Sequence, residues 1–184
     1  MNIAYFDIQQ ENVPVLLFPQ TTPPSFVLVP GQSSKGIDAD ITFKASGKLD
    51  LILTFADMNA EARSQASSAA PVIINPVNNV AEQTFGLWTR YKFTEGIAKG
   101  LAIGIGVSHL SRRAITSNNN ARVYGWLDAF TLVDLALAYD RGDFRYGLNV
   151  DNVFDEEYEA AVRNQSIIVP GMGTNVKASI TWRF

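Results

Sequence analysis

Cysteine is absent from this chain of 184 residues, and histidine occurs once, as His109. Without cysteine, disulfide bonds and thiolate metal sites are excluded, although the cellular compartment stays undecided. No run of about 18 apolar residues occurs either, which excludes a transmembrane helix but not a transmembrane β-barrel, whose strands are only half apolar. Residues 1–8 lack a basic segment before an apolar core, so we expect no export signal in this chain.

An excess of charge of one sign is also lacking. Lys and Arg total 15 and Asp and Glu total 18, so the formal net charge is −3, and the charges are spread along the chain. This balance excludes the basic surface that nucleic-acid binding requires. With 47% hydrophobic and 18% charged residues, the composition is that of a folded chain rather than a disordered one.

The sequence is rich in alternating apolar and polar residues, most clearly between positions 132 and 184. Phe144, Tyr146, Leu148 and Val150 alternate with polar or small residues. The last run repeats this alternation with Val176, Ala178, Ile180, Trp182 and Phe184. A period of two over about nine or ten residues is typical of a strand that crosses an outer membrane, with one side towards lipid and the other towards the lumen.

Eight segments of this kind predict an all-β antiparallel meander of about eight long strands. They are residues 2–13, 34–45, 49–59, 80–93, 100–111, 127–139, 143–153 and 173–184. The connections alternate in length, with long loops at 14–32, 60–79, 112–126 and 154–171 and short turns at 46–48, 94–99 and 140–142. Short turns on one side and long loops on the other indicate part of a transmembrane β-barrel.

Aromatic residues fit the same interpretation. Six lie near the short-turn ends of the segments: Tyr91, Phe93, Tyr139, Phe144, Trp182 and Phe184. Phe55 and Phe85 lie towards the opposite ends, as in the two aromatic girdles of a membrane barrel. A soluble barrel would instead point its apolar side inward, and alternation alone leaves both senses open.

Two motifs and the C-terminus are distinctive. The motifs are Asn152-Val-Phe-Asp-Glu-Glu-Tyr158 and Ser34-Lys-Gly-Ile-Asp-Ala-Asp40, and the chain ends on Thr-Trp-Arg-Phe. These segments resemble the TonB-dependent outer-membrane receptors, especially their siderophore branch, in which the corresponding motifs are Asn-Leu-Phe-Asp-Lys-Glu-Tyr and Ser-Arg-Gly-Val-Glu-Leu-Glu. The resemblance covers essentially the whole chain.

The resemblance implies that residues 1–184 are the C-terminal segment of a receptor β-barrel, without the plug domain. The wall would then be open or incompletely closed, with segments 2–13 and 173–184 each bordering a missing neighbour. The implied function is uptake of a ferric siderophore or similar iron complex across the outer membrane. Ligand and TonB would bind only the complete receptor, and this chain alone would not transport.

The resemblance also implies roles for two sets of residues. Val176, Ala178, Ile180, Trp182 and Phe184 are similar to the C-terminal signal that the outer-membrane barrel assembly machinery recognises. Asn152, Phe154, Asp155 and Tyr158 belong to a structural motif at a strand-to-loop corner, where Phe154 and Tyr158 are expected to anchor the packing. The remaining expected partner is outer-membrane lipid.

Two further interpretations remain open: a self-contained eight-stranded outer-membrane barrel acting as anchor or adhesin, and a lipocalin-like binding barrel. We expect no enzyme and no cofactor, because His109 has no acid or nucleophile placed beside it and continues the lipid side of its strand. We also expect no metal site, since the acidic cluster lacks the glycine and ligand spacing of a calcium loop: Asp151, Asp155, Glu156, Glu157 and Glu159.

Polar residues on the presumed lumen side could pair across strands or hold a plug domain. They are Asp38, Asp40, Thr42, Lys44, Trp88, Arg90, Lys92, Asp134, Arg145, Asn149 and Lys177.

Overall fold

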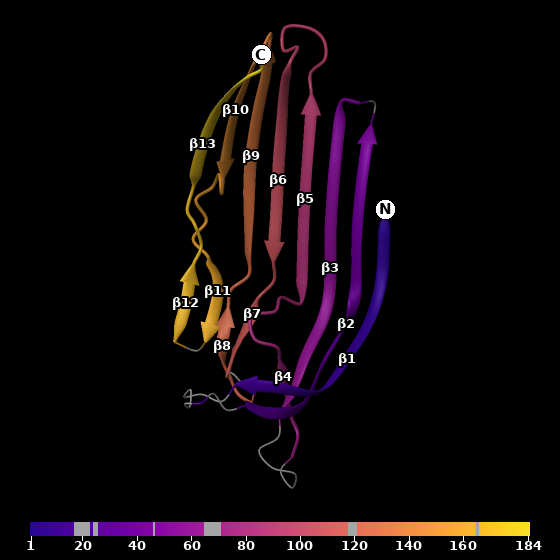
Figure 1. The fold of residues 1–184 in the computed structure, drawn as a ribbon, viewed down its shortest axis with the longest axis vertical. Coiled ribbons are helices and arrows are strands. Elements are labelled where there is room, and N and C mark those ends of the chain that lie inside the picture. Colours follow the sequence, from indigo (N-terminus) through magenta and orange to yellow (C-terminus); the bar gives the residue numbers. More distant parts are fainter. Residues whose placement is uncertain (17–22, 24–25, 46, 65–70, 118–120, 165) are drawn as a thin grey trace.

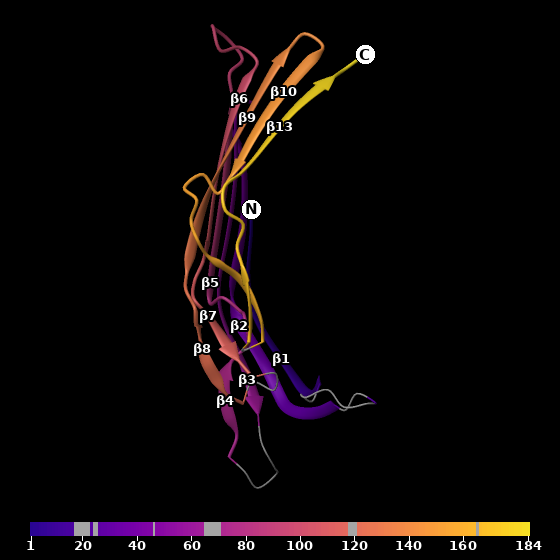
Figure 2. The same ribbon diagram turned by 90° about the vertical axis from the view of Figure 1, so that its left-hand side faces the viewer.

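The computed structural model describes residues 1–16, 23, 26–45, 47–64, 71–117, 121–164 and 166–184. Eight long strands form one antiparallel wall: β1 (Asn2–Leu16), β2 (Phe26–Ala45), β3 (Leu49–Ser64), β5 (Gln83–Lys92), β6 (Leu101–Leu110), β9 (Phe130–Arg141), β10 (Phe144–Asp151) and β13 (Asn175–Trp182). Each strand pairs with the next in this order (Figure 1). Viewed edge-on, the wall is a single curved layer (Figure 2). The described residues include no helix long and apolar enough to span a membrane.

The ladders between strands explain the alternation, because directly paired residues share a face of the sheet. One row runs from Leu53 through Leu87 and Val107 to Val133. A second row runs through Ile103, Leu137, Leu148 and Ala178. We call this side the apolar face. We call the opposite side the polar face. It carries all eleven residues expected on the lumen side; Lys44, for example, pairs with Asp50, which pairs in turn with Arg90.

The first strand departs from a clean division between the two faces. Ile3 and Tyr5 pair with Ala39 and Ile37 on the apolar face. Phe6 pairs with Gly36 and therefore lies on the polar face, together with Ala4 and Ile8. β1 is thus apolar on both sides.

The expected alternation of connections is confirmed from β2 onwards, with short connections after β2, β5 and β9 and long ones after β3, β6 and β10. Between β1 and β2, residues 17–22, 24 and 25 lie outside the described part of the chain. The short turns lie at one end of the wall, uppermost in Figure 1, and the long connections gather at the other end. At the short β9–β10 turn, Arg141 pairs with Phe144, and Gly142 adopts a φ of 58° that an L side chain disfavours. The last strand runs towards the short-turn end, where the C-terminus lies.

The predicted bounds of the four long loops were wrong, because each of these ranges contains strand residues. β1 continues to Leu16 and β2 begins at Phe26, so Pro14 and Pro30 lie inside strands rather than in a loop. Pro14 is tolerated because β1 is an edge strand. Pro30 is tolerated because the β1–β2 ladder skips Pro30 and the residue opposite it, Asn12, whose φ is 53°. The strand expected at residues 127–139 also begins later than predicted, because β9 starts at Phe130.

The other three long connections contain short ladders. β3 continues to Ser64 and pairs with β4 (Ile73–Pro76). β7 (Arg113–Thr116) pairs with β8 (Val123–Leu127), and β11 (Glu159–Asn164) pairs with β12 (Ile167–Pro170). We call these two pairs the outer hairpins; each has only a few residues per strand, too few for alternation to be recognised.

The wall is open. β1 and β13 are its two edges, on opposite sides of Figure 1, and they do not pair with each other in the described part of the chain. The open sheet expected from the sequence is therefore confirmed, and a closed eight-stranded barrel is not formed.

Candidate functional site

Arg113 holds several long connections together at the end of the wall opposite the short turns. Its side chain is only 2% exposed, although arginine is rarely buried without partners. Nη1 donates to the carbonyl of Ala160 at 2.7 Å and to Asn79 Oδ1 at 3.2 Å, and Nη2 donates to the carbonyl of Glu159 at 2.5 Å. Its guanidinium also lies 5.3 Å from the centre of the Phe130 ring. One side chain thus joins β7, β11, β9 and the segment before β5.

Burial lowers the pKa of the Arg113 guanidinium from its ordinary value, and the nearby Glu159 carboxylate opposes this shift. A guanidinium titrates so far above neutrality that it stays charged all the same. Two hydrogen bonds to the β11 backbone and one to Asn79 offset the cost of burying this charge.

Asn152 organises the corner after β10. It is 4% exposed and adopts a φ of 51°, a conformation that asparagine tolerates better than most residues. Its Nδ2 donates to the carbonyls of Glu156 at 2.9 Å and Met172 at 3.1 Å, and its Oδ1 accepts from the Glu156 N–H at 2.9 Å. The Asn152 N–H donates to Asp134 Oδ1 at 2.8 Å, which fixes the corner to β9.

Asp155 and Tyr158 complete this corner. Asp155 Oδ1 accepts from the Thr174 N–H at 2.8 Å and fastens the return of the chain into β13. The Tyr158 ring lies 4.4 Å from the Phe130 ring, and Gly171 leaves room for it. Phe154, in contrast, is 76% exposed, so the packing expected of the two aromatic residues is seen only for Tyr158.

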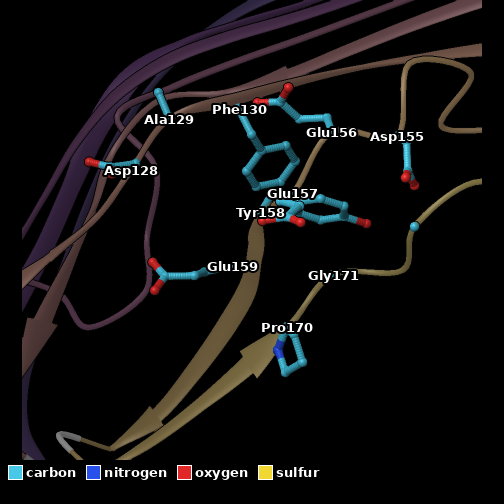
Figure 3. Close-up of a pocket in the computed structure, with 11 residues that line it drawn as sticks. Asp128, Ala129, Phe130, Asp155, Glu156, Glu157, Tyr158, Glu159, Pro170 and Gly171 are labelled. Carbon is cyan, nitrogen blue, oxygen red and sulfur yellow. The ribbon is translucent and has the colours of Figure 1, made fainter.

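Beside this corner is an acidic cavity of about 620 Å³. Figure 3 shows the rings of Phe130 and Tyr158 side by side, with Asp128 and Glu159 on one side and Asp155 on the other. Glu156 and Glu157 line it as well. These carboxylates would attract a cationic group, but among the described residues no three His, Cys, Asp or Glu side chains converge as metal ligands.

The polar face is held by charge pairs across strands. Arg90 lies 2.5 Å from Asp50, and Lys177 lies 2.9 Å from Asp151. Arg145 and Arg183 both approach Asp140 Oδ1 at 3.8 Å. The basic partners Arg90, Arg145 and Lys177 were identified from the sequence as able to pair, whereas their acidic partners were not.

Trp88 covers two glycines on the same face. A Cβ on Gly104 would lie 2.8 Å from Trp88 Cζ2, and one on Gly106 would lie 2.9 Å from Cε3. The small residues of β6 therefore accommodate a neighbouring indole of the wall itself.

His109 lies on the apolar face near the outer end, as predicted, in a row with Phe55, Phe85 and Thr131. Its Nδ1 is 2.8 Å from Thr131 Oγ1. Phe85 lies on β5 and Phe93 directly follows its end, so the two are eight residues apart, about 27 Å at the usual rise, which matches the height of about 25 Å of an apolar barrel band.

The C-terminal residues lie together on the apolar face of the edge strand. Val176 pairs with Val150, Ile180 with Tyr146 and Trp182 with Phe144, while the Phe184 ring is 5.5 Å from that of Trp182. Their recognition by an assembly machinery stays a prediction.

Sequence reasoning missed Arg113 and Thr174, and it identified Asp134 only as a lumen-side polar residue, not as the acceptor of the Asn152 N–H. Arg113 follows another arginine in a short polar stretch, and only the burial of one of the two distinguishes them. Asp134 and Thr174 act through backbone geometry that no residue pattern records.

Known proteins are similar to this chain in sequence and in fold. The profile of the family described as TonB dependent receptor-like, beta-barrel, matches residues 1–153. The metal-pseudopaline receptor CntO of Pseudomonas aeruginosa is 27% identical over 186 residues, which cover 100% of this chain and 25% of the receptor. The ferrioxamine B receptor of Salmonella typhimurium is 25% identical over 159 residues, which cover 82% of this chain and 21% of the receptor.

Solved structures agree in fold. The pyoverdine outer membrane receptor FpvA from Pseudomonas aeruginosa has a TM-score of 0.76 and 21% identity, covering 99% of this chain and 27% of its own. The siderophore receptor PiuA from Acinetobacter baumannii has a TM-score of 0.76 and 17% identity, covering 98% and 25%. The chain spans about a quarter of the length of the curated relatives it matches. It belongs to the TonB-dependent receptor-like β-barrel family, whose members are outer-membrane receptors and transporters.

Proposed function

We propose that this chain is the C-terminal part of the barrel wall of an outer-membrane receptor that takes up a ferric siderophore or a similar iron complex. The apolar face would contact outer-membrane lipid, and the polar face would line the interior. The long connections would lie at the cell exterior and the short turns in the periplasm.

The open wall is the observation that carries this proposal. Six of its eight strands have ten or more residues, long enough to cross a membrane. Both edges nevertheless expose backbone groups that no described strand pairs with, which a bilayer does not tolerate. Further strands must therefore complete the wall. Relatives about four times as long as this chain are compatible with such a complete barrel.

The ligand class is inferred from the relatives. One is named as a receptor for metal-pseudopaline and another as a receptor for ferrioxamine B. The outer hairpins and the acidic cavity lie at the end of the wall where an incoming complex would first arrive.

Gating and coupling to TonB belong, in this proposal, to the complete receptor with its plug domain, and the wall alone does not transport. Val176, Ala178, Ile180, Trp182 and Phe184 would serve as the signal for the barrel assembly machinery. Asn152, Asp155 and Tyr158 would hold the last long connection, and Phe154 would find its packing partner only in the complete receptor.

A self-contained barrel and a lipocalin-like barrel both require closure. Closure would join β1 to β13, which the described residues do not do. The family consists of receptors and transporters, and His109 Nδ1 lies 2.8 Å from Thr131 Oγ1.

Interrupting the coding sequence within this chain, in its own bacterium, tests the proposal. Growth under iron limitation on one or more siderophores of a panel should stop, and the complete gene should restore it only when TonB is present. Radioactive iron uptake gives the same comparison directly. The proposed function would be refuted if the interrupted strain grew and took up iron like its parent on every siderophore of the panel. The strain used must contain no second receptor for these siderophores.

A further inference from the structure

The short-turn end of the wall contains a hollow of about 530 Å³. It lies between the β5–β6 connection and the β9–β10 turn, uppermost in Figure 1. The Asp140 N–H donates to the carbonyl of Gly100 at 3.0 Å and fixes the two connections to each other. We call this hollow the basic hollow for the side chains that line it.

Three cationic side chains line the basic hollow: Lys92, Lys99 and Arg141. None of them has an acidic partner in the described part of the chain, whereas Lys48, Arg90, Arg145 and Arg183 at the same end of the wall all have one. Asp140, which also lines the hollow, is already approached by Arg145 and Arg183 at 3.8 Å. The hollow therefore holds a local surplus of positive charge.

A hydroxyl group adds a directional contact. Thr94 Oγ1 lines the same hollow, is shielded from solvent and has no hydrogen-bond partner among the described residues. A shielded hydroxyl without a partner costs free energy, and an anionic oxygen would satisfy it. Ammonium, guanidinium and hydroxyl donors around one space match the oxygens of a phosphate group.

The hollow also borders the apolar face. Phe93 and Tyr139 line it, and Tyr139 pairs with Leu101 on the apolar face, at the short-turn end of the wall. The ring of Tyr91 meets that of Phe93 edge-on at 4.9 Å. Aromatic residues of this kind occupy the level of lipid head groups. A ligand held here would thus have an anionic head beside the turns and an apolar tail along the wall.

We propose that the basic hollow binds the phosphodiester head group of an anionic phospholipid in the periplasmic leaflet. Lys99, Arg141 and Thr94 contact the phosphate oxygens, and an acyl chain lies along the apolar face beside Tyr139. The inference rests on the proposed insertion of the wall in the outer membrane. A free phosphate has the same oxygens but lacks the acyl chain.

Native mass spectrometry of the complete receptor, purified in non-ionic detergent, tests this site. Phosphatidylglycerol or phosphatidylcholine is added, and the lipid retained by the protein is measured. The variants Lys99→Gln and Arg141→Gln should each bind phosphatidylglycerol about fivefold more weakly, because each removes one charge near the head group. Lys48→Gln, in a neighbouring turn and paired with Glu95, should bind like the parent protein.

Equal weakening by Lys48→Gln would show a general charge effect and overturn the specific site. Displacement of phosphatidylglycerol by millimolar inorganic phosphate, at an affinity matching that of the lipid, would identify a free-anion site and overturn the lipid assignment. Iron uptake is measured separately on the same variants. If Lys99→Gln and Arg141→Gln bind phosphatidylglycerol more weakly but the parent protein takes up no iron, the proposed function is refuted while the lipid site stands.

Discussion

Trp88 packs over two glycines of the neighbouring strand β6. Gly104 and Gly106 lie where a neighbouring indole needs the space of a Cβ, so the glycines serve packing rather than turning. A large aromatic side chain laid over glycine restores the contacts that a strand glycine otherwise forfeits.

Gly106→Ala should therefore destabilise the barrel by about 1–3 kcal/mol, because the added methyl group forces the Trp88 ring out of place. The measurement is urea unfolding of the detergent-solubilised receptor, followed by tryptophan emission. Gly125→Ala is the matched control, since its Cβ would meet only Ile115 Cδ1, at 3.9 Å. Equal stability of both variants would contradict the packing role of Gly106.

Asn152 leads to a second prediction at the residue scale. Asn152→Asp should cost about 3 kcal/mol at neutral pH, because a carboxylate would face the carbonyl oxygens of Glu156 and Met172 with no proton to donate. The cost should shrink in acid, where the protonated carboxyl group can again donate to one of them.

The unfolding free energies of variant and parent, compared as a function of pH, provide the measurement. Asn149→Asp, on the exposed polar face, should stay within about 0.5 kcal/mol of the parent protein. A cost that is independent of pH would show that the amide donor is not what holds this corner.

At the scale of elements, the wall strands were predictable and the outer hairpins were not. Alternation over eight or more residues identifies a strand of the wall, as in β10 and β13, because one face is consistently apolar. β7 and β12 have four residues each and are stabilised by Arg113 and Tyr158 rather than by a pattern of their own. The residues that hold the corner after β10 were found through a family motif, and no alternation marks Arg113.

Arg113 gives a prediction for these elements. Arg113→Ala removes charged hydrogen bonds to β11 and to Asn79, and should lower the free energy of local opening there by about 3 kcal/mol. Amide hydrogen exchange in β7 and β11 should become about a hundredfold faster, while exchange in β6 stays unchanged.

Arg112→Ala is the adjacent control. Arg112 is exposed and contacts the Trp126 ring at 4.5 Å, so its loss should leave β11 protected. If both variants open β11 equally, the guanidinium of Arg113 does not join the outer hairpins.

At the scale of the whole molecule, the two free edges, β1 and β13, determine whether the wall can close. Among the described residues no strand pairs with the outer side of β1 or of β13, so we expect further strands to border both. The absence of cysteine from these 184 residues makes this measurable, because an introduced pair of thiols is the only pair in this part of the receptor.

In the complete receptor, a cysteine at Ala4 or Phe6 combined with one at Ser179 or Thr181 should remain reduced under mild oxidation, because β1 and β13 are opposite edges. The control pair, at Asn149 and Lys177, should form a disulfide, because these residues face each other across β10 and β13. Gel mobility with and without reductant distinguishes the two. Cross-linking of an edge pair as efficient as that of the control would mean that this chain closes on itself.

The buried guanidinium of Arg113 also constrains how such receptors diverge. Exposed surface loops usually change independently of one another during evolution, but Asn79, Arg113 and the backbone of β11 share one set of hydrogen bonds. A substitution at position 79 or 113 alters the support of a connection more than forty residues further along the chain. Positions in these separate segments are therefore expected to covary among homologues, so that the connections change in concert rather than singly.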